Sequence, residues 1–193
     1  DKFNIHSKKN SIIPHGFSNN YFKTKKLKKD KSFNIIYVSS IDFYKNHSTL
    51  IKSSLMLNDQ GYNIKLFFVG DFINDEMKNI FKNNIIGKPL LKKILFHKKY
   101  LNEKSIIKLM SNMDLVCFPS SCESMGLGLL EGMASHLPVI CSNSSSLKET
   151  FKLKKYMFNP HDREELSKLI KKIIDNKEIS KLNANLTRNN AKK

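Results

Sequence analysis

Two carboxylates eight residues apart, Glu123 and Glu131, stand in the most informative stretch of the sequence. Two glycines, Gly126 and Gly128, lie between them, at the start of a run that is typical of a helix. Free backbone N–H groups at a helix start, with the positive end of the helix dipole, form a site suited to phosphate. A carboxylate beside a nucleotide accepts hydrogen bonds from sugar hydroxyls. The spacing therefore favours one acid at a transferred sugar, the other at a ribose, and amides between them at phosphates.

The same glycines do not fit the dinucleotide-binding motif of oxidoreductases. The run reads G-L-G-L-L-E, which places Glu131 where that motif requires a third small residue. The run also follows the fourth predicted strand, whereas the motif follows the first.

The net charge of +17 favours anionic partners but does not indicate a nucleic-acid-binding protein. Only two of the 34 basic residues are arginine, the side chain that contacts phosphates and bases through paired hydrogen bonds. Lysine, asparagine and isoleucine are all abundant and have codons rich in A and T, so we attribute much of the lysine excess to genome composition. We therefore expect nucleotides, phosphates or a lipid surface as partners, and no nucleic acid.

The cysteines and histidines predict neither a metal site nor a disulfide framework. Cys117 and Cys141 fall in apolar runs, no C-x-x-C pair occurs, and the six histidines are scattered. No apolar stretch reaches the ~18 residues of a membrane span, and no apolar leader opens the chain. We expect a cytoplasmic protein without a cofactor that at most touches the inner face of a membrane.

The elements that must position these residues alternate between strand and helix from residue 33 onward. Continuous apolar runs predict strands at 33–39, 63–70, 94–97, 115–118 and 139–141, with an edge strand at 156–158. Apolar residues at helical spacing predict helices at 46–58, 73–83, 103–113, 126–135, 147–151 and 162–174. This order predicts a doubly wound α/β domain, a parallel sheet with helices on both faces and ligands at the carboxyl ends of the strands.

Residues 33–175 make up this predicted domain. Residues 1–32 are predicted to be a leading segment, with a turn at 14–16 and a lysine-rich linker without regular structure at 23–31. Residues 176–193 are predicted to be a C-terminal tail, because no apolar period continues beyond Glu178. We expect that tail to fray or to dock on another domain.

The stretch 118–150 reads FPSSCESMGLGLLEGMASHLPVICSNSSSLKET. It resembles the donor-binding signature of the family 4 retaining glycosyltransferases, F-x-P-S-x-x-E-G-F-G-L-x-x-L-E-A-M-A-x-G-x-P-V-I-x-S-x-x-x-S-L-x-E, with both acids in register. IPHG at 13–16 is similar to the family's I-P-N-G turn, and YVSSIDFYK at 37–45 to its Y-V-G-R-L-x-x-x-K-G loop. The resemblance covers residues 12–175 and implies the Rossmann-like C-terminal half of a two-domain GT-B enzyme (glycosyl transferases group 1).

The resemblance implies a role for each matched residue. Glu131 is expected at the ribose hydroxyls, Glu123 at the hydroxyls of the transferred sugar, and Lys45 at the departing diphosphate. Glu123 and Lys45 are thereby the implied catalytic residues, with no metal. The other implied donor contacts are Ser39, Ser40, Gly70, His97, Ser124, Met125, Gly126 and Leu127. The base is expected against the loop 97–100.

The sequence departs from the family pattern at three places. Ser40 stands where the family usually has a phosphate-binding arginine, which leaves Lys45 as the matched cation. Ser124 and Met125 replace Gly-Phe, and His136 replaces a glycine at the helix end. The N-terminal acceptor domain of the family is missing from this chain, so we expect half of an enzyme that is inactive alone.

Several assignments have a second interpretation. Lys45, one lysine among 32, also fits an exposed surface, Ser39 and Ser40 fit a strand-end turn, and His97 fits packing. The chain itself fits two functions. One is a donor domain for retaining sugar transfer in glycan or surface-polysaccharide synthesis, at a membrane surface or on a lipid-linked acceptor. The other is a donor-domain remnant that binds a nucleotide or a partner without chemistry.

Overall fold

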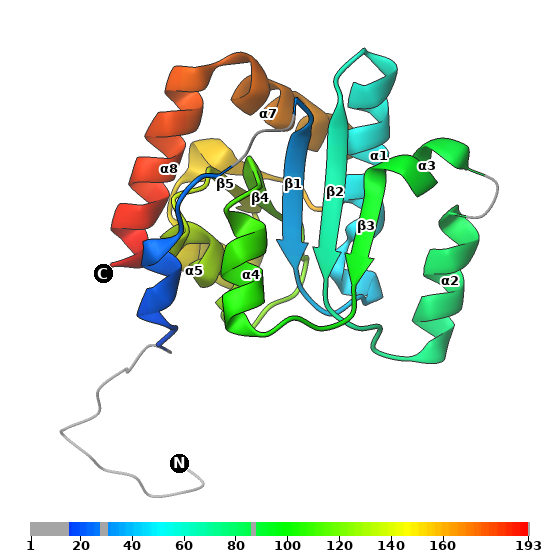
Figure 1. Cartoon of the computed structure of the whole chain (residues 1–193), viewed down its shortest axis with the longest axis horizontal. Helices are drawn as coiled ribbons and strands as arrows, with labels where there is room; N and C mark the ends of the chain where they lie inside the picture. The colour runs from blue at the N-terminus through cyan, green and yellow to red at the C-terminus, as the bar shows by residue number, and fades with distance from the viewer. Residues whose placement is uncertain (1–15, 28–30, 86–87, 193) are drawn as a thin grey trace, which may run out of the picture.

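The computed structural model describes residues 16–27, 31–85 and 88–192. Six parallel strands form one sheet in the spatial order β3-β2-β1-β4-β5-β6 (Figure 1). The order reverses at β1, which pairs with β2 on one side and β4 on the other. Ligands of such sheets bind where the order reverses, at the carboxyl ends of the strands. The strands are β1 Phe33–Val38, β2 Ile64–Val69, β3 Leu95–Lys98, β4 Leu115–Phe118, β5 Val139–Ser142 and β6 Met157–Phe158.

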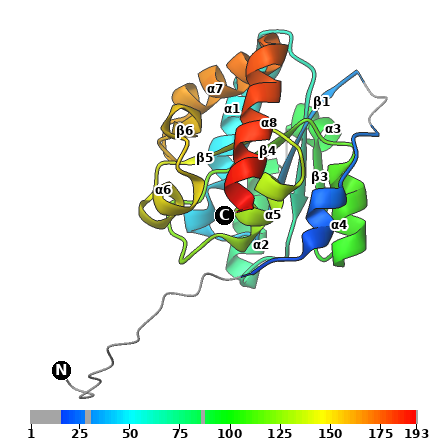
Figure 2. The ribbon, with the colours of Figure 1, turned by 90° about the vertical axis from the view of Figure 1, so that its left-hand side faces the viewer.

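Helices cover both faces of the sheet, which confirms the predicted doubly wound α/β fold. They are α1 His47–Asp59, α2 Asp75–Ile85, α3 Pro89–Ile94, α4 Glu103–Met110, α5 Leu127–Ala134, α6 Ser145–Phe151, α7 Arg163–Asp175 and α8 Lys177–Ala191. α1 and α7 pack against each other on one face, and α4 lies on the other beside the 3₁₀ helix η1, Asn19–Lys23 (Figures 1 and 2). In the described ranges, no helix has the length and apolar character needed to cross a membrane.

The central strand β1 explains why apolar runs in this sequence are continuous. Ile35, Ile36 and Tyr37 are all completely buried, because helices cover the sheet on both sides. Ile35 pairs with Leu66 in β2, and Ile36 pairs with Val116 in β4. The polar side chains of the site therefore lie in the loops that follow the strands and on α5, except His97, which lies in the edge strand β3.

The C-terminal segment corrects one prediction. Residues 177–191 form α8, which packs along α5 and does not fray. Asn183 is completely buried on this helix; its side-chain amide donates to the Val139 carbonyl at 2.9 Å and its oxygen accepts from the Val139 N–H at 2.6 Å. A buried amide matched to strand backbone takes a place that an apolar residue usually holds, and this weakens the apolar period.

Helix α3 and His136 are two local features of the helical layers. Helix α3 was not predicted, because six residues are too few to show a helical period, and Ile94 ends that helix and does not begin β3. His136 follows α5 with a φ of 64°, in the left-handed region. A non-glycine residue at such a helix end costs about 1 kcal/mol, as expected from the replaced glycine.

Candidate functional site

The site begins at the junction of β4 and α5. Gly126 has a φ of 76° and is the N-cap of α5, and no side chain of the described residues caps this helix start. The first N–H groups of α5, those of Leu127 and Gly128, therefore have no acceptor within the helix. A Cβ atom on Gly128 would lie 2.8 Å from the Val38 carbonyl oxygen, so a glycine lets the helix start lie directly against the end of β1. The resulting amides suit an anionic ligand.

The loop after β1 is tied to the loop after β4. The Tyr44 carbonyl accepts from the backbone N–H of Ser121 at 2.8 Å and from the Ser121 hydroxyl at 3.1 Å. The side-chain amide of the buried Asn46 donates to the Pro119 carbonyl at 3.1 Å. These bonds hold the two loops at the switch point of the sheet in one arrangement.

The two predicted catalytic residues, Lys45 and Glu123, meet between these loops. Lys45 Nζ lies 2.6 Å from Glu123 Oε1, and the side chains are only 12% and 10% exposed. A charge-assisted bond this short and this sheltered from water fixes both side chains. The alternative in which Lys45 is an ordinary surface lysine does not fit this burial.

The imidazole of His47, close to Lys45, does not add positive charge to the site. His47 is almost completely buried against the rings of Tyr37 and Phe68, at centroid distances of 4.6 and 4.9 Å. Burial, with smaller contributions from the neighbouring His97 and Lys45, lowers the pKa of His47 to about 3. The ring is neutral near pH 7, which leaves Lys45 as the cation of this loop.

Serine and threonine side chains from the β5–α6 region support the Glu123 loop from behind. The Ser146 hydroxyl donates to the Glu123 carbonyl and the Thr150 hydroxyl to the Met125 carbonyl at 3.4 Å. The Ser142 and Ser144 hydroxyls both donate to the Ser120 carbonyl. Sequence reasoning assigned no role to these groups, although the serine run at 142–146 was the available signal.

Glu131 lies in a different environment, half-buried on α5. Burial raises its pKa above the ordinary value; a hydrogen bond from the Tyr21 hydroxyl lowers it, and the Glu103 carboxylate raises it. Tyr21 is itself only 2% exposed, and burial and the Glu131 carboxylate raise the pKa of its hydroxyl. Among the described residues, Glu131 forms no ion pair, so its environment contrasts with that of Glu123.

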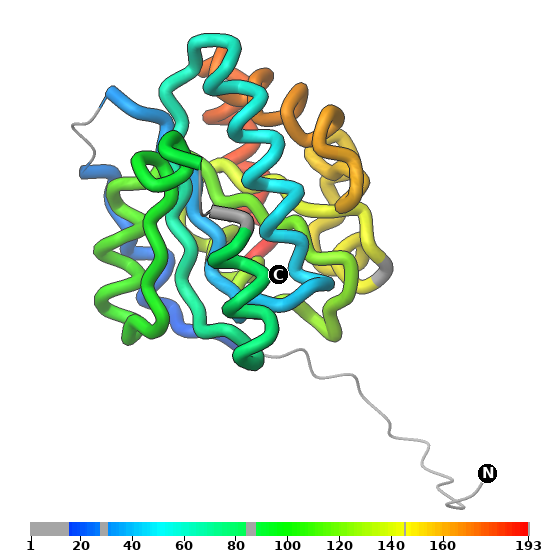
Figure 3. The backbone as a smooth tube through the Cα atoms, turned by 90° about the vertical axis from the view of Figure 1, so that its right-hand side faces the viewer, coloured from blue at the N-terminus to red at the C-terminus, as the bar shows by residue number. Residues whose placement is uncertain are grey.

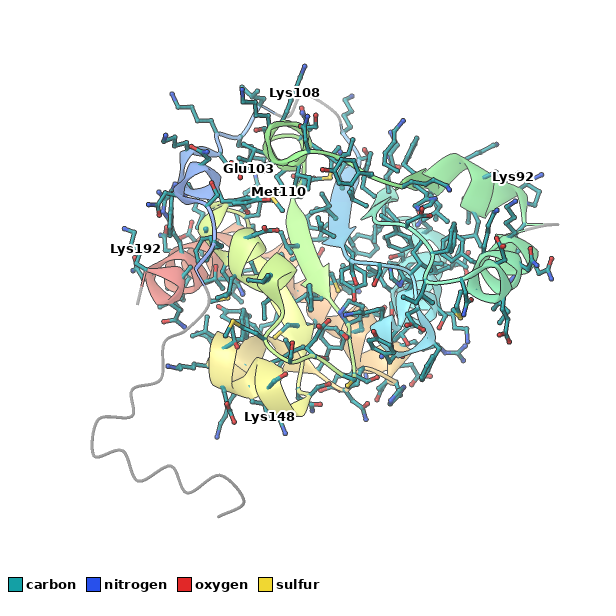
Figure 4. All side chains as sticks on the ribbon, turned by 90° about the horizontal axis from the view of Figure 1, so that it is seen from below. Lys92, Glu103, Lys108, Met110, Lys148 and Lys192 are labelled. Carbon is teal, nitrogen blue, oxygen red and sulfur yellow. The ribbon has the colours of Figure 1, made fainter. Side chains whose placement is uncertain are left out.

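Tyr21 belongs to the leading segment, where no site residue was predicted. Its helix η1 contacts α5 and is fixed to the start of α4, since Glu103 accepts from the Ser18 hydroxyl at 2.9 Å and the Asn20 amide at 2.8 Å. Figure 4, which looks onto the carboxyl ends of the strands, shows Glu103 between η1 and α4. No motif signalled Tyr21. The predicted turn at 14–16 lies outside the described residues except for Gly16.

The remaining predicted residues fall into two groups. Ser39, Gly70 and His97 meet at the ends of β1, β2 and β3, where His97 Nε2 bonds the Gly70 carbonyl at 2.8 Å. Gly70 has a φ of 150°, and a Cβ atom on it would overlap the Ser39 carbonyl. Half-buried His97 also packs on Phe72, at a centroid distance of 5.1 Å, so it has a packing role whatever it binds.

The second group follows β4. Ser124 and Leu127 are exposed, and Met125 is half-buried beside Gly126. Ser40, in the first loop, is exposed as well. The structure thus brings the predicted residues to one end of the sheet, with Glu131 in contact with Tyr21 and not with the Lys45–Glu123 pair.

Two bacterial proteins are similar to this sequence over part of their length. The chain is 31% identical to protein CapJ of Staphylococcus aureus over 145 residues, which cover 72% of this chain and 34% of CapJ. It is 33% identical over 75 residues to the serotype-specific mannosyltransferase WbdA of Escherichia coli, covering 39% of this chain and 9% of that protein. The chain therefore spans about a third of the length of CapJ and less than a tenth of the length of WbdA.

Solved structures share the fold over almost the whole chain. A glycosyltransferase from Rickettsia africae superposes with a TM-score of 0.80 at 20% identity, covering 94% of this chain and 52% of that one. Anabaena Alr3699/HepE in complex with UDP and glucose superposes with a TM-score of 0.78 at 19% identity, covering 94% and 51%. The family model described as glycosyl transferases group 1 matches residues 19–193. With nearly the entire chain matched, this protein belongs to the group 1 glycosyltransferases.

Proposed function

We propose that the chain binds a nucleotide-diphospho-sugar and is the donor half of a retaining glycosyltransferase in glycan or surface-polysaccharide synthesis. The observation that carries this proposal is the meeting of Lys45 and Glu123, 2.6 Å apart, beside the uncapped start of α5. Cation, carboxylate and free amides are the groups needed for a diphosphate and a sugar at one site.

Each group has a distinct task in this proposal. Lys45 and the first N–H groups of α5 stabilise the negative charge that develops on the diphosphate as the glycosidic bond breaks. The lysine ammonium has three donors, so it can keep its bond to Glu123 while another N–H reaches a phosphate oxygen. Glu123 accepts hydrogen bonds from hydroxyls of the transferred sugar, and the lysine holds it in place.

Glu131 accepts hydrogen bonds from the ribose hydroxyls, and the base lies against the loop 97–100. The donor contacts include Ser39, Ser40, Gly70, His97 and the residues 124–127. Positive charge for the diphosphate comes from Lys45, so we propose that no metal is needed. A related fold, that of Anabaena Alr3699/HepE, has been solved with UDP and glucose, which supports a donor of this class.

We also propose that transfer needs an N-terminal, acceptor-binding half. This chain covers 52% of the solved Rickettsia glycosyltransferase and 34% of CapJ, so those proteins contain a further portion of similar or larger size. The acceptor would meet the donor between the two halves. We place this reaction in the cytoplasm, where nucleotide sugars are the donors.

Titration calorimetry with UDP, GDP and inorganic phosphate tests the proposal. We expect weak binding of at least one nucleoside diphosphate, tighter than binding of phosphate, and no sugar transfer by the chain alone. Absence of nucleoside diphosphate binding in the folded chain would contradict a donor-binding function. Turnover by the isolated chain would contradict the need for an acceptor half but not donor binding.

A further inference from the structure

One edge of the molecule carries an excess of positive charge. The sequence from 77 to 102, which spans most of α2, all of α3 and β3 and the following loop, contains seven lysines and no aspartate or glutamate. Five of these lysines are exposed and make no ion pair with any described residue: Lys82, Lys88, Lys92, Lys93 and Lys98. The acids just before this stretch are Asp71, which pairs with Lys99, Asp75, which pairs with Lys78, and Glu76, which lies in the first turn of α2.

Large apolar side chains are exposed among these lysines. Ile80 on α2 is 46% exposed, Leu90 on α3 is 39% exposed, and Phe96 on β3 is 41% exposed. We call these three residues and the five lysines the β3-edge surface. Figure 3 looks onto this edge and shows the green segments of α2, α3 and β3 next to one another.

The helices of the β3-edge surface bury only a few side chains, which include Leu91 and Ile94 of α3. In the described part of α2, Phe81 is the one buried side chain. Phe96 lies on the outermost strand, where its ring stacks on Phe67 at a centroid distance of 4.8 Å. Exposed apolar groups with lysines around them are typical of segments that lie in the interface of a membrane.

We propose that the β3-edge surface docks on an anionic lipid bilayer. Lysines near an anionic surface are attracted to it, and the apolar side chains enter the region between headgroups and acyl chains. A second copy of this chain would bring another positively charged edge and be repelled. A nucleic acid would use the lysines but would leave Ile80 and Leu90 without an apolar environment.

This docking would place the donor site close to the membrane. β3 ends at Lys98, within the segment 97–100, whose Tyr100 is 83% exposed, so the surface adjoins the proposed base site. A lipid-linked acceptor would then be presented near the cleft. Apart from Lys98, which lies in the loop 97–100, no residue of the β3-edge surface is a proposed donor contact, so the inference goes beyond the proposed function.

The absence of tryptophan from the sequence allows a direct test. Leu90→Trp places a single indole on the β3-edge surface, and Leu182→Trp places one on α8, at a position that is 47% exposed. With vesicles of phosphatidylglycerol and phosphatidylcholine, we expect a blue shift and quenching by brominated lipid for the Trp at 90 and neither for the Trp at 182. An equal response at both positions, or none at 90, would overturn the proposal.

Charge reversal gives an independent measurement on the chain without tryptophan. The triple variant Lys88→Glu, Lys92→Glu, Lys93→Glu is expected to lower partitioning into anionic vesicles roughly 100-fold, from the attraction of each lysine to such a surface. The matched control is the triple variant Lys168→Glu, Lys172→Glu, Lys177→Glu on α7 and α8, which has the same net charge. Its partitioning into anionic vesicles should fall by about tenfold less than that of the first variant. Equal losses would mean that total charge alone controls binding and would overturn the proposal.

Two further readouts keep the outcomes separate. Ile80→Ser with Leu90→Ser is expected to lower vesicle partitioning about tenfold through lost apolar burial, without changing binding to a single-stranded RNA. If only RNA binding responds to the lysine variants, the surface is a nucleic-acid site and the proposal is wrong. Calorimetry with UDP on the same variants should be unchanged, which distinguishes failure here from failure of the donor-binding proposal.

Discussion

The two acids of the site, eight residues apart, lie in opposite electrostatic environments. Glu123 is in a loop, bonded to the Lys45 ammonium at 2.6 Å, with its backbone carbonyl held by Ser146. Glu131 is on a helix, half-buried, with the Tyr21 hydroxyl as its donor, the Glu103 carboxylate nearby and no ion pair in the described part of the chain. The spacing in the sequence suggests that the two carboxylates are equivalent, but in the fold their surroundings differ.

The two environments favour different contacts with a ligand. Glu123 has its charge balanced before any ligand arrives, so a sugar hydroxyl adds a bond to an already fixed acceptor. Glu131 carries the cost of burial without a cation, as its raised pKa shows. That cost is offset only when further donors arrive, so Glu131 is the position where ligand hydroxyls should contribute most.

The largest effect is therefore expected at Glu131. Glu131→Ala should weaken UDP or GDP binding by about 1.5–3 kcal/mol, the strength of hydrogen bonds to a charged group. Titration calorimetry measures this, with circular dichroism to confirm that the variant is folded. Glu178→Ala, at an exposed carboxylate on α8, is the matched control. Unchanged affinity in a folded Glu131→Ala variant would remove Glu131 from the donor site.

Lys45→Ala should have the next largest effect, a loss of about 1–2 kcal/mol in diphosphate affinity through the lost charge-assisted bond. It also leaves Glu123 unpaired beside the diphosphate. Alanine at Lys25 or Lys168, both exposed, should cost much less. Measurements at low and moderate salt complete the test, because a general charge effect would make the three variants equivalent and strongly salt-dependent.

Ser40→Arg should strengthen diphosphate binding by about 1 kcal/mol, because a guanidinium donates two charge-assisted bonds where serine donates one neutral bond. Ser40 is exposed at the end of β1, so the longer side chain has room. The same substitution in the Lys45→Ala background should recover part of the lost affinity. If the arginine changes affinity in neither background, the first loop does not face the diphosphate.

The smallest effect is expected from Glu131→Gln, measured as stability. This substitution should increase stability, whereas Glu131→Ala should weaken ligand binding. Because the pKa of Glu131 is raised in the folded state, its protonated side chain contributes stability that is complete below the ordinary pKa of 4.5. That stability is lost as the pH rises through the raised pKa and the side chain ionises. The neutral glutamine avoids this loss, so it should raise Tm near pH 7, and only slightly because the Glu131 side chain is half-buried. Urea unfolding of both proteins across about pH 4–8 checks the sign of the stability difference, which should grow as the pH rises through the raised pKa. A difference independent of pH would contradict the assignment to burial.

Much of the fold was predictable because its signals are local. Continuous apolar runs such as 33–38 predict central strands, and the turn after Phe118 with Gly126 predicts an uncapped helix start. Helix α8 escaped prediction because its docking depends on Asn183 bonding the backbone of Val139, a contact 44 residues away. Tyr21 escaped for the same reason, since a lone tyrosine in a polar segment carries no signal until the chain folds back onto α5.

The order of strands and helices, the family and the types of residue available to a donor follow from the sequence, because periodicity and motif spacing are properties of neighbouring residues. Which charges meet depends on the tertiary fold. Lys45 and Glu123 are 78 residues apart and form one ion pair because parallel strands end at the same edge of the sheet. Tyr21 and Glu131 meet because η1 packs on α5. Electrostatic environment depends on distances in space, and those distances arise only when the sheet and its loops have assembled.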